Sequence, residues 1–186
     1  MYVRHSAKFG KEIKIIHPGE YYVSGENELI GTLLGSCVAV CLIDMKKSVC
    51  GMNHFMLPGR ITRRNVMADP QAKYGITAIN RLLTSMRERG CRNANIIAKI
   101  FGGGRVLDSV LGSHSIPEDN VRLAKVMLEL EDIPIVESDS GGNYTRKLLL
   151  DVHSGKVFLK KSTRKDFLAV ISRQEKEYIK RGFTDG

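Results

Sequence analysis

Two short apolar runs joined by a polar turn constrain the fold more than any other part of the chain. The runs "CVAVCLI" (37–43) and "VCGMNHFML" (49–57) flank the segment "DMKKS". Both runs are rich in branched residues and are apolar at nearly every position, which is typical of strands that a sheet buries on both faces. We therefore predict a β-hairpin in a sheet whose two faces are both covered.

Further strands are expected on either side of this hairpin. The same composition predicts strands over 30–34, 94–101, 133–137, 147–152 and 156–161, and the last two flank "HSG", a typical hairpin turn. "HPGEYYVS" (17–24) predicts a turn into one more short strand, and the residues before it are polar and basic.

Three segments have apolar residues at helical spacing and predict helices. The first begins near Asp69, a suitable cap, with Pro70 in its first turn, and stops at Gly90. The second follows "SIPEDN" and ends before Pro134, and the third follows a cap at Ser162 or Thr163. The predicted inward faces are Ile79, Leu82, Leu83 and Met86; Val121, Ala124 and Leu128; and Phe167, Val170, Ile171 and Tyr178.

The order of these elements predicts a mixed α/β domain with packed β-sheets and helices on the outside. The strands first cluster and then alternate with helices, and 186 residues suffice for one well-buried core. We predict one domain, with residues 1–161 as its body and residues 162–186 as a basic helical extension of it.

The net charge and the cysteine content limit the possible partners and the cellular location of the protein. The net charge of +9 invites a nucleic-acid partner, but Lys and Arg are scattered, only 6% of residues are aromatic, and there is no Trp for base stacking. We expect no nucleic acid and no membrane insertion, and instead a basic surface that suits an acidic protein. The absence of an apparent signal peptide predicts a cytoplasmic protein, in which the four cysteines stay reduced.

A cysteine and a histidine on the predicted hairpin are candidates for a reactive pair. A turn centred between Met45 and Lys46 places Cys37 directly across from His54, on one side of the sheet. Opposed side chains have Cβ atoms about 4.5–5.5 Å apart, close enough for a thiol and an imidazole to meet. Such a pair gives a nucleophile and its general base. Gly35 and Ser36 allow a sharp turn that brings backbone N–H groups near the sulfur, as in an oxyanion hole.

Two other interpretations of these residues stay open. The spacing C-x3-C-x8-C-x3-H from Cys37 to His54 resembles a zinc site, although strand residues four apart lie about 13 Å from one another, too far to share a metal. Alternatively, Cys37 is a small core residue and His54 a buried, hydrogen-bonded histidine. Cys41, Cys50 and Cys91 are expected in the core.

The later glycine motifs are less specific. "FGGG" (101–104) lacks the pattern of a phosphate-binding or dinucleotide-binding loop. We interpret Gly102 and Gly103 as a turn that borders the cleft, or as a contact for the substrate or a partner. Arg146, after "SGGNYT", is either a surface arginine of a strand or one that holds an acidic group.

Several of these motifs together resemble a known family. "TLLGSCVAVCLID", "GMNHFMLP", "AKIFGGG", "EDNVRLAKVMLELEDIPIVESDSGGNYTRKL" and "DVHSGKVFLKK" occur in the same order in the CheD family of chemoreceptor glutamine deamidases. The resemblance covers about residues 17–161. It implies a cysteine-hydrolase-like α/β sandwich that hydrolyses glutamine side-chain amides on methyl-accepting chemoreceptors to glutamate and ammonia, a protein-glutamine glutaminase.

The resemblance also implies roles for individual residues. Cys37 is the nucleophile that forms a thioester, His54 is the base, and Thr32 is the candidate third residue, unless it is only a threonine at a strand end. It implies no cofactor and no metal, and as partners the cytoplasmic helices of chemoreceptors and the CheC phosphatase. The alternatives are a non-catalytic chemotaxis adaptor that binds receptors or CheC, and a protease or transglutaminase that uses the same pair.

Overall fold

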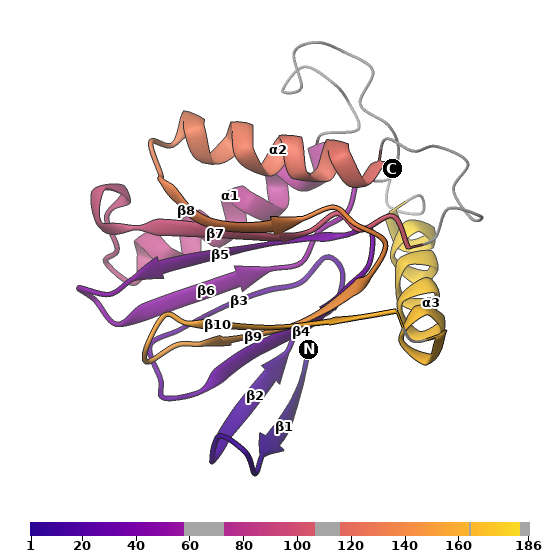
Figure 1. The fold of residues 1–186 in the computed structure, drawn as a ribbon. Coiled ribbons are helices and arrows are strands. Elements are labelled where there is room, and N and C mark those ends of the chain that lie inside the picture. The colour runs from indigo at the N-terminus through magenta and orange to yellow at the C-terminus, as the bar shows by residue number, and fades with distance from the viewer. Residues whose placement is uncertain (58–72, 107–115, 164, 183–186) are drawn as a thin grey trace.

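Two β-sheets packed face to face, with two helices against one of them, make up most of the molecule (Figure 1). This computed structural model describes residues 1–57, 73–106, 116–163 and 165–182. The predicted mixed α/β class with packed sheets and outer helices is confirmed.

Each sheet has five strands. The outer sheet contains β1 (Tyr2–Ser6), β2 (Lys11–Ile15), β4 (Leu29–Leu34), β9 (Thr145–Asp151) and β10 (Val157–Ser162), in that spatial order. The central sheet has the order β3 (Tyr21–Ser24), β6 (Val49–Asn53), β5 (Val38–Asp44), β7 (Ile97–Gly102) and β8 (Ile135–Ser140). Only the pairs β2–β4 and β7–β8 are parallel among the described strands.

The helices α1 (Lys73–Glu88) and α2 (Ile116–Leu130) cover the central sheet on the side away from the outer sheet (Figure 1). All four residues predicted for the inner face of α1 are buried. Gly90, at φ +80°, ends this helix as predicted, with the amide of Cys91 bound to the carbonyl of Met86. In α2, Ala124 and Leu128 are buried. The residues predicted to begin α1, Asp69 and Pro70, lie outside the described residues.

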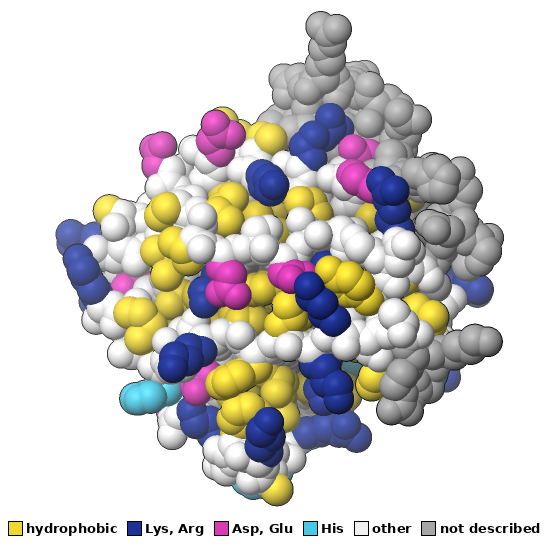
Figure 2. All heavy atoms as spheres, in the orientation of Figure 1, with side chains coloured by type: hydrophobic (Ala, Val, Ile, Leu, Met, Phe, Trp, Pro, Cys, Tyr) yellow, Lys and Arg dark blue, Asp and Glu magenta, His cyan; other side chains and the backbone are white. Residues whose placement is uncertain are grey.

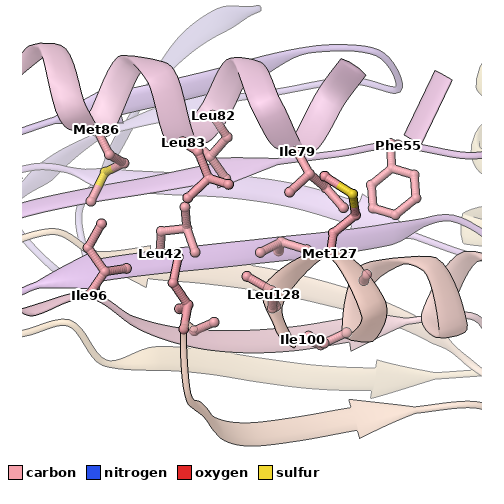
Figure 3. Close-up of a cluster of buried hydrophobic side chains, with 14 of the residues drawn as sticks. Leu42, Phe55, Ile79, Leu82, Leu83, Met86, Ile96, Ile100, Met127 and Leu128 are labelled. Carbon is pink, nitrogen blue, oxygen red and sulfur yellow. The ribbon is translucent and has the colours of Figure 1, made fainter. Parts of the chain in front are cut away.

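Both faces of the central sheet are buried, as the unbroken apolar runs predict. Leu42 of β5 faces α1 and α2 (Figure 3), and Val38 and Val40 belong to the same cluster. Ala39, Cys41 and Ile43 face the outer sheet. Every residue of β5 and β6 is buried. One strand therefore supports two apolar layers, because successive side chains point to opposite faces.

The predicted register of the central hairpin is wrong by two residues, since the predicted turn places Cys41 across from Cys50. The structure pairs Cys41 with Met52 and Ile43 with Cys50. The turn spans four residues, 45–48, because the side chain of Asp44 accepts hydrogen bonds from the amides of Lys46 and Lys47. The shift moves residues along the ladder by an even number, so Cys37 and His54 still belong to the same face of the sheet.

Other element boundaries differ in specific ways. β1 and β2 were not predicted as strands, because nearly all of β1 is exposed and its sequence carries no apolar alternation. Residues 93–95 form a 3₁₀ turn, so β7 starts three residues later than predicted. β6 ends at Asn53, after which Phe55 makes a single bridge to Val38.

The third helix, α3 (Lys165–Gly182), lies at one end of the two sheets rather than against a face of either (Figure 1). Ile171 is buried as predicted, and Phe167 and Tyr178 are half-buried. Val170 is 47% exposed, so its predicted inward position is wrong.

The surface shows no concentration of charge on the face in view. In Figure 2, Lys and Arg side chains are scattered among acidic and apolar ones. Within the described part of the chain, no helix has the length and apolar character to cross a membrane.

Candidate functional site

The loop of residues 35–37 carries the chain from the outer sheet to the central sheet, and it brings the predicted site residues to one end of the sandwich. Thr32 lies on β4, Cys37 directly precedes β5, and His54 directly follows β6. All three are buried. Thr32 shares the inner face of β4 with Ile30 and Leu34, since alternate residues of a strand face the same way.

The hydroxyl of Thr32 fixes the tautomer of His54. It donates a hydrogen bond to the carbonyl of Ile16 at 2.9 Å, so its oxygen accepts at 2.8 Å from Nδ1–H of His54. With its proton on Nδ1, the imidazole keeps a free lone pair on Nε2. This is the tautomer that a general base needs.

The other ring nitrogen of His54 is available for chemistry. Nε2 is buried and has no hydrogen-bond partner among the described residues. Burial, together with the nearby His17, lowers the pKa of His54 to about 3, so the ring is neutral at physiological pH. Backbone hydrogen bonds to the carbonyl of Glu20 and from the amide of Gly19 hold the residue in place.

Cys37 lies on the same face of the central sheet as His54, but the two are diagonal neighbours rather than directly opposed. The bridge between Val38 and Phe55 places Met56 across from Cys37. Within the described ranges, no hydrogen bond joins the thiol to the imidazole. The thiol instead donates to the carboxylate of Glu175 at 3.3 Å.

Glu175, a buried residue of α3, occupies the position next to the cysteine. Its carboxylate accepts hydrogen bonds from the amide of Ser36 at 3.1 Å, from the Ser36 hydroxyl at 2.8 Å and from Cys37. Burial raises the pKa of this carboxyl, although the hydrogen bonds from Ser36 and Cys37, including the Cys37 amide, act in the opposite direction. Burial and the charge of Glu175 raise the pKa of the Cys37 thiol well above its usual value.

Sequence reasoning missed Glu175. It lies four residues after Ile171 and three before Tyr178, so a charged residue on the predicted inner face of the third helix was the available indication.

A second missed residue, Asn120, holds the same loop from the other side. Its side-chain amide donates to the carbonyl of Ser36 at 3.0 Å and accepts from the amide of Leu57 at 2.8 Å. Since a trans peptide points its C=O and N–H in opposite directions, this bond turns the Cys37 amide toward Glu175. The sequence placed Asn120 four residues before the core residue Ala124, a polar residue on an apolar face.

The glycines at the end of β7 and directly after it are buried and support the cysteine loop. The carbonyl of Cys37 accepts from the amide of Gly103, and that of Gly35 accepts from Gly104, both at 2.8 Å. Gly102 has φ +118°, and a Cβ there would lie 2.1 Å from the Cys37 carbonyl oxygen. Only glycine permits this approach.

Arg146 is fully buried, so its interpretation as a surface arginine is wrong. It binds the carboxylate of Asp139 and the carbonyl of Gly141, at 2.8 and 2.7 Å, and its guanidinium lies over the ring of Tyr144. The acidic group that Arg146 holds therefore belongs to its own chain.

The other cysteines lie apart from this chemistry. Cys41, Cys50 and Cys91 are free and buried. Among the described residues, no cluster of three or more His, Cys, Asp or Glu side chains could hold a metal ion. A neutral histidine with a free nitrogen, a nearby cysteine and a loop of directed amides is an arrangement suited to hydrolysing amide or ester bonds through the sulfur.

Comparison with known proteins identifies the family. Residues 56–161 match the family model described as CheD chemotactic sensory transduction. A protein of Dechloromonas aromatica named probable chemoreceptor glutamine deamidase CheD 1 is 41% identical over 167 residues, 90% of this chain and 82% of that protein. A relative with the same description from Saccharophagus degradans is 36% identical, over 93% of this chain and 80% of its own length. The chain belongs to the CheD family.

The fold has a distant likeness among solved structures. The crystal structure of the hypothetical protein YfiH of Bacillus licheniformis aligns with 66% of this chain and 51% of its own, at 15% identity and a TM-score of 0.39. The assignment to the CheD family does not depend on this likeness.

Proposed function

We propose that this protein is a protein-glutamine glutaminase that converts glutamine side chains of methyl-accepting chemoreceptors to glutamate and ammonia. Its relatives of 36–41% identity are named as probable chemoreceptor glutamine deamidases. The observation that carries the proposal is the position of the Glu175 carboxylate, which is hydrogen-bonded to Ser36 and Cys37. A glutamate side chain, the product of this reaction, fits between the Ser36 amide and the Cys37 sulfur.

In the first half of the reaction, Cys37 attacks the substrate. The Nε2 atom of His54 takes the thiol proton, and the sulfur bonds to the δ-carbon of the glutamine. The amides of Ser36 and Cys37 hold the resulting oxyanion in the position of the Glu175 carboxylate oxygen. The C–N bond then breaks as the imidazolium gives its proton to the leaving nitrogen, which releases ammonia and leaves a thioester.

In the second half, water replaces ammonia. His54 takes a proton from water, and the hydroxide attacks the thioester carbon. The C–S bond breaks, the imidazolium returns its proton to the sulfur, and glutamate is released. Thr32 positions the ring by holding Nδ1–H, so Thr32→Val is expected to slow the reaction less than loss of Cys37 or His54.

The test is deamidation of the cytoplasmic fragments of the organism's own chemoreceptors, followed by peptide mapping. The wild-type protein should convert specific glutamines, whereas Cys37→Ala and His54→Ala should convert none. Cys41→Ala is the matched control, since Cys41 is also free and buried on the same face of β5 but lies within the strand, outside the loop of residues 35–37. Conversion of glutamines by Cys37→Ala would contradict the mechanism. If the wild-type protein also converts none, the adaptor interpretation is favoured.

Two further points belong to this proposal. The reaction is placed in the cytoplasm, where cysteines remain reduced and where the receptor helices lie. Binding of a CheC-type phosphatase stays a prediction, and co-purification of the two proteins with and without receptor fragments would test it.

A further inference from the structure

Helix α3 is held at the functional site by a small number of side chains. Ile171 lies over Gly35, where a Cβ would come within 2.7 Å of its Cγ2, and Tyr178 lies equally close over Gly19, at 2.6 Å. Gln174 binds the imidazole of His17 at 3.1 Å. Between these contacts, Glu175 enters the loop of residues 35–37. The two glycines thus provide the space in which the helix lies.

The carboxylate of Glu175 reproduces the binding of a reaction product. It is attached to a helix through the two methylene groups of a glutamate, and its oxygens accept hydrogen bonds from the Ser36 amide and from the cysteine that would attack a glutamine. A substrate carboxamide needs the same donors and the same space. Both cannot be bound at once.

We propose that the surface under α3 is the binding site for the target side chain of the substrate, and that α3 occupies it as an intramolecular competitor with Glu175 in the position of the product glutamate. This inference rests on the proposed function. It adds that the structure shows a closed form, and that α3 must leave before a receptor glutamine can reach Cys37.

The chemistry of the closed form agrees with this assignment. Cys37 is completely buried, and the thiol donates its proton to a carboxylate instead of to a base. The neighbouring negative charge also disfavours the thiolate, which the reaction requires. Departure of α3 removes the competing acceptor and this charge together.

The docking of α3 is suited to reversal. Of its described side chains, only Ile171 and Glu175 are buried. Glu175 forms no salt bridge with any other described residue, and burying an unpaired carboxylate has a cost that offsets part of the docking free energy. The helix begins at Lys165, directly after β10 ends at Ser162, and such a short tether gives an effective concentration on the order of millimolar. A substrate must overcome this tethered competitor.

The first test compares Glu175→Ala with Glu177→Ala in the full-length protein. Glu177 is an exposed glutamate two residues further along the same helix. The rate of Cys37 alkylation by iodoacetamide needs no substrate, and Glu175→Ala should raise it about tenfold or more, the effect of one pKa unit on the thiolate. The same variant should lower the KM for receptor fragments more than it changes kcat, because the open fraction rises. Glu177→Ala should behave as wild type.

The second test makes α3 a substrate. In Glu175→Gln, a carboxamide lies where the product carboxylate was, and Cys37 should hydrolyse it back to glutamate within the same chain. Peptide mass mapping should show this conversion, and the double variant Cys37→Ala, Glu175→Gln should keep the amide. Glu177→Gln should also keep its amide. Ile171→Lys, which places a charge in the docking contact, should raise alkylation of Cys37 without any change at position 175.

The outcomes separate this inference from the proposed function. Equal alkylation in Glu175→Ala and Glu177→Ala, or loss of receptor deamidation in Glu175→Ala, would overturn the role of α3. An intact amide in Glu175→Gln, in a protein that converts receptors, would overturn the placement of residue 175 in the substrate position. Faster alkylation of Cys37 in Glu175→Ala, without conversion of receptor glutamines or of residue 175 in Glu175→Gln, would have a different meaning. It would show that α3 covers Cys37 but would contradict the proposed deamidase activity.

Discussion

The helices α2 and α3 each send one buried polar side chain to the same loop, from opposite sides. Asn120 of α2 binds the carbonyl of Ser36, and Glu175 of α3 binds the amide of Ser36. Behind Asn120, α2 buries an apolar stripe against the central sheet, which includes Leu123 and Met127. Behind Glu175, the buried apolar residue is Ile171.

This difference in apolar burial separates a permanent support from a removable one. Burying a leucine-sized side chain contributes about 1.5–3 kcal/mol, so the stripe of α2 holds that helix firmly. A helix with little buried apolar area opens at a much smaller free-energy cost. Under the proposed role of α3, α2 holds the loop of residues 35–37 in place, whereas α3 blocks that loop reversibly.

The largest expected effect is on global stability. Leu123→Ala in α2 should lower the free energy of unfolding by about 2–5 kcal/mol, because it leaves a cavity in the core. Ile171→Ala in α3 should change the main unfolding transition far less, since α3 can undock while the sheets stay folded. Urea unfolding followed by circular dichroism measures both. If Ile171→Ala lowers the free energy of unfolding as much as Leu123→Ala, α3 unfolds together with the core and does not differ from α2 in this respect.

The next effect concerns the direction of the Cys37 amide. Asn120→Asp keeps an acceptor for the amide of Leu57 but loses the donor to the carbonyl of Ser36. The amide should then be misdirected in the oxyanion site, and kcat should fall by about 10²–10³ with little change in KM. Asn80→Asp, at an exposed position of α1, is the matched change of charge. A full kcat in Asn120→Asp would show that the peptide is held without this bond.

The smallest effect is a pH dependence of α3 docking. Burial raises the pKa of Glu175 above its usual 4.5, so the docked helix favours the protonated carboxyl. Docking should therefore weaken as the pH rises from about 4.5 through the raised value. The facing groups are Ser36 and the thiol of Cys37, whose own pKa is raised, so it stays neutral over this range.

Amide hydrogen exchange of α3 relative to α2 in the same sample measures this change, because the intrinsic effect of pH on exchange cancels in the ratio. The ratio should increase with pH in wild type and stay level in Glu175→Ala. The same increase in Glu175→Ala would assign the titration to another group.

Much of the fold was predictable because its causes are local. The spacing of Ile79, Leu82, Leu83 and Met86 predicted the buried face of α1, and Gly90 predicted its end. The unbroken apolar runs predicted a sheet covered on both faces. The register of the central hairpin failed because a single side chain, Asp44, set the length of its turn.

The candidate site was predictable only in part. Cys37, His54 and the Gly35–Ser36 turn follow from the sequence, and the contact of Thr32 with His54 follows once β4 and β6 are placed. Asn120 and Glu175 reach the loop from 84 and 139 residues away in the chain. Nothing in the sequence around either residue indicates that its side chain contacts the loop of residues 35–37.

The sequence by itself determined the elements, the apolar faces and the cysteine and histidine that could react, because each depends on residues close together in the chain. Only the tertiary structure decided which polar groups surround that cysteine. Its thiol meets a carboxylate from α3, and this contact depends on how the two sheets and the last helix fit together at their common end. Hydrogen bonds between distant segments, unlike periodic apolar burial, leave no pattern along the chain.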